Sequence, residues 1–349
     1  MSLAIAVEPS RAAQGNPAGG LCVGAIALRN RVLLAPMSGV SDLPFRMLAH
    51  RLGAGVVVTE MVASRELVRE RRDVVRRMAA DRTITPHVVQ LAGCEAQWMA
   101  EGARIAEAQG ADAIDINMGC PARLVTGKQS GSALMRDLDH ALALIEATVG
   151  AVKVPVTLKM RMGWDARSLN AAELARRAQA AGIRMLTVHA RTRNQFFTGT
   201  ADWPFIASVK AAVTIPVIAN GDIITIAGAK RALELSGADG IMIGRGAYGA
   251  PWLPGRIAQV LAGRPDPGEP ALVEQGRIVI QHYQDMLSHY GRELGRRNAR
   301  KHLGWYVARA SICAQAALRW RKTLCAEDSP EKVQAALRAF YDTAAERAA

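Results

Sequence analysis

Residues 113–121 read Ala-Ile-Asp-Ile-Asn-Met-Gly-Cys-Pro, an apolar strand that ends in a group of polar and reactive side chains. Because side chains alternate along a strand, Asp115 and Asn117 are predicted to share one face. Glycine then loosens the backbone, Cys120 presents a thiol, and proline fixes the exit of the chain. A half-buried structural cysteine is one interpretation, since unpaired cysteine often behaves as a small apolar residue. A chemical role for the thiol is the other, and the remaining sequence favours it.

The same strand-first pattern recurs along the chain from Arg31 onward. Runs such as Gly55–Thr59 and Pro216–Ala219 are almost entirely apolar, which is typical of parallel strands covered on both faces. Strands are predicted at residues 31–36, 55–60, 86–91, 112–117, 153–161, 184–190, 215–220 and 239–244. Helices are predicted near residues 43–52, 62–80, 95–109, 133–151, 171–181, 203–213, 225–236 and 247–262.

Eight strand–helix units predict an α/β fold, the (β/α)8 TIM barrel. An open doubly wound sheet is the alternative, but it rarely contains eight units in even succession. The Pro- and Gly-rich run Arg264–Pro270 predicts a linker. Helical segments follow near residues 271–290, 296–317 and 329–347. We therefore expect a flexible tail (1–20), a barrel domain (21–262) and a C-terminal all-α helical domain (263–349).

Composition restricts the class of protein further. The 349 residues are 50% hydrophobic and 21% charged, and the net charge of +13 favours an anionic partner, either nucleic acid or a membrane surface. Five scattered cysteines without a CxxC pair are typical of a reduced, cytoplasmic protein without a structural zinc site. No apolar run approaches the ~20 residues of a membrane span. We expect no membrane association, no metal and a monomer.

Most of the predicted strands have one or two polar residues at their carboxyl ends. They are Glu60, Gln90, Asn117, Lys159, Arg161, His189, Arg191, Asn220 and Arg245. A barrel gathers the carboxyl ends of its strands on one rim, so these groups are predicted to converge around a single mouth. Structural caps explain one or two of them and explain the whole set poorly.

The segment Gly244–Gly249 satisfies the pattern G-x-G-x-x-G. A dinucleotide-binding fold needs that unit early in a sheet, with an acid about 20 residues further on. Here the pattern closes the eighth unit, and Asp266 at that distance lies in the linker. In a barrel, the loops after strands seven and eight commonly bind phosphate. Residues Asn220–Asp222 and Gly244–Arg245 therefore predict a phosphate-bearing ligand.

The predicted mouth contains no pair of facing carboxylates, so glycoside hydrolysis is unsupported. Flavin mononucleotide (FMN) fits better, with its phosphate on Gly244–Arg245 and Lys159 neutralising charge on the reduced ring. Gln90 and Asn117 could bond the edge of that ring. A cysteine thiol is mostly protonated at neutral pH, so Cys120 could donate a proton. Hydride from a reduced flavin and this proton together would saturate a polarised C=C bond.

A basic segment follows the linker. Between Arg292 and Lys322 the chain has nine basic residues and one acid, Glu293, with Trp305, Tyr306 and Trp320 interleaved. A solvated basic helix face is the plain alternative. A polyanion with bases that can stack fits the mixture better.

Several of these motifs resemble the tRNA-dihydrouridine synthases. The resemblance covers about residues 25–320 and rests on Ala35–Asp42, Asp115–Pro121, His189–Arg193, Asn220–Asp222 and Gly244–Ala247. Residues 300–306 are similar to the bacterial B-type branch. The family implies an FMN-dependent enzyme, reduced by NADPH as co-substrate, that saturates the C5=C6 bond of specific uridines in tRNA.

The resemblance also implies residue roles, with Cys120 as the proton donor at C5. The residues expected to bind the flavin are Pro36, Met37, Ser38, Gln90, Lys159 and His189 around its ring and Asn220, Gly221, Asp222, Gly244 and Arg245 at its ribityl phosphate. The residues expected to contact tRNA are Asn117, Arg191, Arg296, Arg297, Arg300 and Lys301. Two positions depart from the family: Ser38 replaces a frequent Ala, and Ala190 replaces a frequent Gly, which could narrow the space beside His189.

Two other functions remain open from the sequence. One is a flavin barrel that reduces a small molecule, similar to a dihydroorotate dehydrogenase, although the basic helical domain would then have no role. The other is an RNA-binding protein whose barrel has lost catalysis, although Cys120 and Lys159 are both intact.

Overall fold

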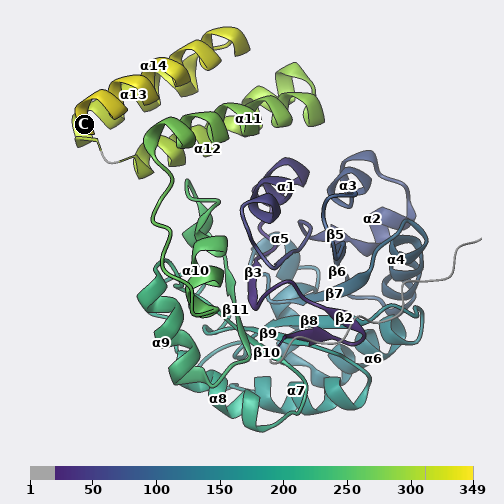
Figure 1. The fold of residues 1–349 in the computed structure, drawn as a ribbon. Helices are drawn as coiled ribbons and strands as arrows, with labels where there is room; N and C mark the ends of the chain where they lie inside the picture. Colours follow the sequence, from purple (N-terminus) through teal and green to yellow (C-terminus); the bar gives the residue numbers. More distant parts are fainter. Residues whose placement is uncertain (1–19, 311, 349) are drawn as a thin grey trace, which may run out of the picture.

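A computed structural model describes residues 20–310 and 312–348. Its centre is a parallel sheet in the order β4-β3-β11-β10-β9-β8-β7-β6-β5 (Figure 1). The strands are β3 (Val32–Leu34), β4 (Val56–Val57), β5 (Val62–Ala63), β6 (Val88–Ala92), β7 (Ala113–Met118), β8 (Val156–Arg161), β9 (Leu186–His189), β10 (Val217–Asn220) and β11 (Gly240–Ile243). Their positions agree with the eight predicted strands to within a few residues, apart from β5.

The two ends of this sheet belong to one stretch of chain, so the sheet closes on itself. β4 and β5 are successive segments of the second strand of the barrel. A parallel bridge between Val58 and Val88 joins this strand to β6. The backbone amide of Gln90 also donates to Thr59 Oγ1 at 3.0 Å. The predicted (β/α)8 barrel is therefore confirmed, and an open doubly wound sheet is excluded.

Helices surround the barrel wall. They are α1 (Leu43–Arg51), α2 (Ser64–Val68), α3 (Arg72–Arg77), α4 (Ala96–Ala108), α5 (Arg123–Thr126), α6 (Leu138–Val149), α7 (Ala171–Ala180), α8 (Trp203–Ala211), α9 (Ile226–Ser236) and α10 (Leu253–Leu261), with 3-10 turns η1 (Gly131–Arg136) and η2 (Arg245–Ala247). The single helix predicted at 62–80 is wrong: the segment is β5 followed by α2 and α3. Glu70 adopts a left-handed φ of 54° there, a conformation that a continuous helix cannot contain.

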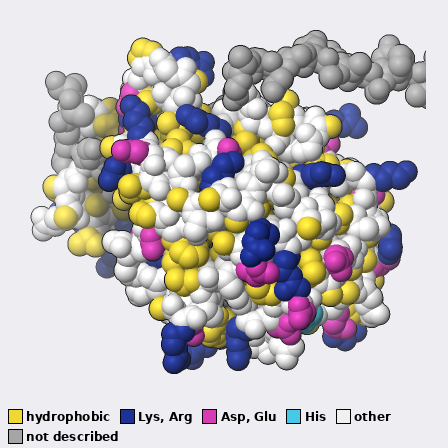
Figure 2. Space-filling view, turned by 90° about the horizontal axis from the view of Figure 1, so that it is seen from below, with side chains coloured by type: hydrophobic (Ala, Val, Ile, Leu, Met, Phe, Trp, Pro, Cys, Tyr) yellow, Lys and Arg dark blue, Asp and Glu magenta, His cyan; other side chains and the backbone are white. Residues whose placement is uncertain are grey.

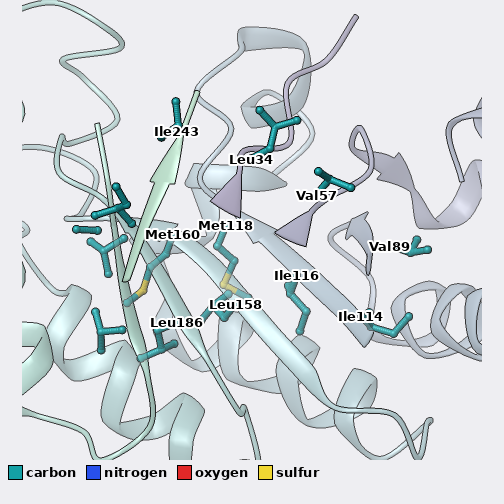
Figure 3. Close-up of a cluster of buried hydrophobic side chains, with 14 of the residues drawn as sticks. Leu34, Val57, Val89, Ile114, Ile116, Met118, Leu158, Met160, Leu186 and Ile243 are labelled. Atoms are coloured by element: carbon teal, nitrogen blue, oxygen red, sulfur yellow. The ribbon is translucent and has the colours of Figure 1, made fainter. Parts of the chain in front are cut away.

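Alternation along each strand separates two cores. Outward-facing side chains, such as Leu34, Ile116 and Met160, pack beneath the helices (Figure 3). Inward-facing side chains, such as Leu33 and Met242, fill the amino-terminal half of the barrel.

A short antiparallel hairpin packs against the inward-facing core at the amino-terminal end. It is formed by β1 (Cys22–Val23) and β2 (Ile26–Ala27). Two-residue strands carry no period, so the sequence did not predict this hairpin. The tail expected at residues 1–20 lies almost wholly outside the described residues.

The C-terminal region forms a helical layer beside α1 and α10 (Figure 1). It contains α11 (Leu272–Tyr290), α12 (Arg292–Arg309), α13 (Ala314–Ala326) and α14 (Pro330–Ala348). A second apolar cluster, which includes Tyr283, Leu303 and Phe340, holds these helices together. The helix predicted at 296–317 is wrong, because Ala310 is extended and separates α12 from α13. Neither Gly nor Pro signals that break in the sequence.

Among the helices of residues 20–310 and 312–348, none is both long and apolar enough to cross a membrane.

Candidate active site

A cavity of about 820 Å³ opens at the carboxyl ends of the strands. The predicted flavin-binding residues, Cys120 and Asn117 all line it. Together they are Pro36, Met37, Ser38, Gln90, Asn117, Cys120, Lys159, His189, Asn220, Gly221, Asp222, Gly244 and Arg245. The sequence missed other lining residues, among them Met61, Phe196, Phe197, Ile224 and Tyr248. Most of these lie on loops, where no period reveals which way a side chain points.

A chain of hydrogen bonds runs from the barrel interior to the backbone amide of Cys120. Thr157 Oγ1 donates to Asp115 Oδ1 at 2.6 Å, and Gln90 Nε2 donates to Asp115 Oδ2 at 2.7 Å. Asn117 Nδ2 donates to Gln90 Oε1 at 2.7 Å. Asn117 Oδ1 in turn accepts from the Cys120 amide at 3.0 Å. The chain of bonds thus connects buried Asp115, through Gln90 and Asn117, to the backbone of Cys120.

The carboxyl group in this series of hydrogen bonds is that of Asp115, which is buried. Burial raises its pKa, whereas the hydrogen bonds from Thr157 and Gln90 and the charge of Lys159 oppose the rise. The sequence placed Asp115 on the same face as Asn117, and the strand register confirms that placement.

The backbone that carries Cys120 is held from two sides. Arg161 Nε donates to the Gly119 carbonyl at 2.8 Å, and Ser132 Oγ donates to the Cys120 carbonyl at 2.9 Å. The Cys120 side chain is half-buried and lines the cavity. This position does not fit a structural cysteine sealed in the core.

Lys159 is buried on the inner face of β8. Its Nζ donates to Asn220 Oδ1 at 3.1 Å, and Asn220 Nδ2 donates to the Met242 carbonyl at 2.8 Å. Burial, with a smaller contribution from the charge of Arg161, lowers the pKa of Lys159 to about 8. An anion bound beside Nζ would restore the charged form, because opposite charges favour ionisation.

His189 faces the cavity as a neutral imidazole. Burial lowers its pKa well below the ordinary value, and the nearby charges of Lys159 and three arginines add to the shift. A Cβ on Gly221 would lie 3.1 Å from His189 Cδ2, so the imidazole ring has room only because residue 221 has no side chain. Ala190 belongs to the outer core. It therefore points away from the ring, and the expected narrowing by Ala190 is wrong.

The loops after β10 and β11 form a cradle of backbone amides. Within the described chain, the amides of Gly221, Asp222, Gly244 and Arg245 donate no hydrogen bond to a protein acceptor. A Cβ on Gly246 would lie 2.5 Å from the Ile223 carbonyl oxygen, so this glycine lets the two loops meet. Free amides together with the Arg245 guanidinium are a donor set suited to phosphate.

Arg191 differs from its predicted position at the mouth. Its side chain is 1% exposed and is absent from the cavity lining. It donates to the carbonyls of Thr198 and Gly199 and to the Asp222 carboxylate. Burial would raise the pKa of Asp222, but the hydrogen bonds from Arg191 and the Ala201 amide outweigh it and the pKa is lowered. Arg191 therefore holds Asp222 and residues 198–199 in place from inside the protein. This placement does not match the expected contact with substrate.

The basic residues predicted to contact tRNA from the helical region have unequal surroundings. Arg296 and Arg300 both pair with Asp328. Arg297 is exposed and has no acidic partner among the described residues. Lys301 lies over the barrel, where its Nζ is 3.7 Å from the position of a Cβ on Gly39. None of the four lines the mouth cavity.

Together, fold and site define a (β/α)8-barrel protein whose mouth combines a thiol, a buried lysine and a cradle of backbone amides that are unpaired in the described part of the chain. Comparison with known proteins narrows this class. The model of the family described as dihydrouridine synthase (Dus) matches residues 33–346. The chain belongs to the dihydrouridine synthase family.

Relatives agree with this assignment. A probable tRNA-dihydrouridine synthase of Rhodobacter capsulatus is 58% identical over 281 residues, covering 80% of this chain and 87% of the relative. The tRNA-dihydrouridine synthase B of Pseudomonas putida is 46% identical over 82% of this chain and 85% of its own length. The synthase B of Xanthomonas campestris pv. campestris is 44% identical over 92% of this chain and 95% of its own length.

Solved structures of low identity share the fold. Histamine dehydrogenase from Rhizobium sp. 4-9 matches with a TM-score of 0.54 and 14% identity, over 76% of this chain and 50% of that protein. A 2-naphthoyl-CoA reductase matches with a TM-score of 0.54 and 12% identity, over 70% and 52% of the two chains. At such identities the likeness concerns the architecture alone.

Proposed function

We propose that this protein is an FMN-dependent tRNA-dihydrouridine synthase that uses NADPH to reduce the C5=C6 bond of specific uridines in tRNA. Family membership supports the reaction. The observation that carries the proposal is that Cys120, Lys159 and the amide cradle line one cavity. In the overall reaction NADPH gives a hydride and becomes NADP⁺, and the uridine gains that hydride and one proton.

The residues of the mouth fit FMN in their chemistry. The unpaired amides of Gly221, Asp222, Gly244 and Arg245 suit a terminal phosphate. Lys159 is a buried cation that lacks an anionic hydrogen-bond partner among the described residues. A volume of about 820 Å³ lies in the range of small-molecule and cofactor sites. When bound, reduced FMN supplies the hydride.

The chain itself supplies the proton and the geometry. Cys120 donates its thiol proton to C5 of the uracil ring, and a proton from solvent replaces it. The Asn117 carboxamide holds the Cys120 amide, so the thiol keeps its place at the rim. Neutral His189 presents a hydrogen-bonding edge without adding a charge.

A tRNA substrate imposes further requirements. The target base must leave its stack to enter a cavity at the end of a barrel. Recognition then depends on tRNA shape and phosphate contacts, and the basic helical region is suited to these. We accordingly propose residues 21–262 as the catalytic domain and residues 263–349 as the tRNA-binding domain. The cytoplasmic location and the monomeric state stay predictions.

Replacing the thiol tests the proposal. Cys120→Ala should still purify with FMN, release it on denaturation and accept hydride from NADPH. It should lose about 10²-fold or more of its dihydrouridine formation on unmodified tRNA, the range of a missing general acid. Dihydrouridine is counted by mass spectrometry of digested tRNA.

Cys94→Ala is the matched control, since Cys94 is also half-buried but does not line the cavity. It should keep full activity. Undiminished turnover by Cys120→Ala would remove the thiol from the mechanism. A colourless wild-type protein that FMN cannot reconstitute would contradict the flavin site.

A further inference from the structure

Most basic residues of the helical region belong to one of two groups. One group is ion-paired within the protein. Its pairs are Arg277 with Glu274, Arg292 with Glu331, Arg296 with Glu293 and Asp328, Arg300 with Asp328, and Arg309 with Glu269. The other group has no acidic partner among the described residues and is exposed. Its members are Arg297, Arg319, Arg321, Lys322, Lys332 and Arg338. Three of these six lie on α13, and the two on α14 share that helix with acidic residues such as Glu331 and Asp342.

Helix α13 is unusual in its charge. Its residues 314–326 include three basic and no acidic side chains. Ala316 and Leu324 are buried against the neighbouring helices, and Trp320 is turned toward them. Arg319 and Lys322 therefore lie on the outward face. Arg321 lies at the edge of this face, against α12, and is also exposed. Among the described residues, none of the three has an acidic partner within ion-pair distance.

Helix α12 contacts both α13 and the rim of the mouth cavity. A Cβ on Gly304 would lie 3.3 Å from Arg321 Nε, so the guanidinium lies against the α12 backbone. The next residue, Trp305, stacks on Tyr248 with 4.0 Å between the ring centroids. Tyr248 lines the mouth cavity. Arg297 lies two turns before Gly304 and so on the same side of α12.

Other parts of the surface place acidic side chains beside many of their basic ones. On the face shown in Figure 2, Lys and Arg side chains are interspersed with Asp and Glu. On the outer helices of the barrel, Arg176 pairs with Glu173, and Arg231 pairs with Glu234. Exposed basic residues without an acidic partner in the described chain also occur on the barrel, among them Arg69, Arg123 and Lys128. Helix α13 differs in having three basic residues and no acidic residue within one helix.

We infer that the outward face of α13, together with Arg297, binds backbone phosphates of tRNA, whereas the paired arginines of α12 hold the helical region together. The inference rests on the proposed function, because it takes its partner from the tRNA substrate. It also revises the sequence-based expectation for Arg296 and Arg300, whose charges are already engaged by Asp328.

RNA suits this face better than a membrane surface does. Phosphate contacts need exposed cations and release counterions on binding. A membrane-surface helix needs a broad apolar face as well. On α13 the single large apolar side chain that is clearly exposed is Leu318, at 67%.

The test removes three charges from α13 and three from the paired group. The first variant is Arg319→Gln/Arg321→Gln/Lys322→Gln. The matched control is Arg277→Gln/Arg292→Gln/Arg309→Gln, whose arginines all pair with glutamates. Affinity for unmodified tRNA is measured against salt concentration with the flavin-loaded full chain. The slope of log K against log salt should fall by about 2 to 3 in the first variant, since each lost contact removes about 0.7–0.9. The control should keep the wild-type slope.

Each outcome has a defined meaning. A wild-type slope in the α13 variant, or an equal loss in the control, overturns the inference. Loss of binding to phosphatidylserine vesicles with unchanged tRNA binding would assign the face to a membrane and also overturns it. Reduction of the flavin by NADPH shows that both variants are folded. A wild-type protein that forms no dihydrouridine on tRNA refutes the proposed function instead, whatever the slopes.

Discussion

At the residue scale, the mouth depends on how burial changes single groups. Lys159 keeps a pKa of about 8, far below the ordinary lysine value, because burial and the charge of Arg161 both disfavour its charged form. An anion beside Nζ reverses this effect. Binding of anionic FMN to the empty protein above pH 8 should therefore take up one proton.

The sign of the pH dependence follows. Below pH 8 Lys159 is already charged, so affinity for FMN should be constant. Above pH 8 the proton must be taken up, so affinity should fall as pH rises, by up to about tenfold per pH unit. Fluorescence quenching of FMN on protein stripped of its flavin measures this between pH 7 and pH 9.5. Lys159→Met should bind more weakly with a flat profile, and a flat wild-type profile would disprove the linkage.

At the scale of elements, close backbone contacts fix how a helix lies on the barrel. Gly255 in α10 packs on the turn between α1 and β4. A Cβ there would lie 1.9 Å from the Leu52 carbonyl oxygen and 3.0 Å from Gly53 Cα. Both neighbours are backbone atoms, so neither can move aside cheaply.

Gly255→Ala should therefore lower the free energy of unfolding by about 1–3 kcal/mol, as expected for overpacking. Gly228→Ala in α9 is the control, because its Cβ would meet only the exposed Thr225 hydroxyl at 3.1 Å. The control should be neutral or slightly stabilising, since alanine is the better helix former. Denaturant melts of both variants measure the difference, and equal stabilities would show that α10 shifts without cost.

At the scale of the whole molecule, aromatic contacts join the helical region to the barrel. Trp305 of α12 stacks on Tyr248 beside the mouth. Phe45 of α1 lies 5.6 Å from His282 and 5.3 Å from His302 between ring centroids. The helical region is thereby held at a defined place relative to the cavity, as the proposed recognition of tRNA shape requires.

A double-mutant cycle measures this coupling. Tyr248→Ala and Trp305→Ala should interact by about 0.5–1.5 kcal/mol in the free energy of unfolding, the range of aromatic pairs. Tyr248→Ala combined with Trp320→Ala should be additive, because Trp320 packs in the separate helical cluster. Additivity in the first pair would mean that the stack does not hold the two regions together.

The sequence by itself determined the barrel and most of its mouth. The alternation of side chains along a strand is a local property, and it places Asp115, Asn117 and Lys159 on the inner face. Closure of the sheet into a barrel then brings the ends of the strands together. The same logic assigned Cys120 to the rim and the loops after the last two strands to a phosphate.

Only the tertiary structure decided which charges are free. Asp328 engages Arg296 and Arg300 from 28 or more residues away, and Arg191 turns inward to Asp222. Such partners are set by how separate elements pack, and no period or spacing encodes them. For that reason the basic stretch of the sequence was visible at once, whereas the exposed cations of α13 became distinguishable only after the chain had folded.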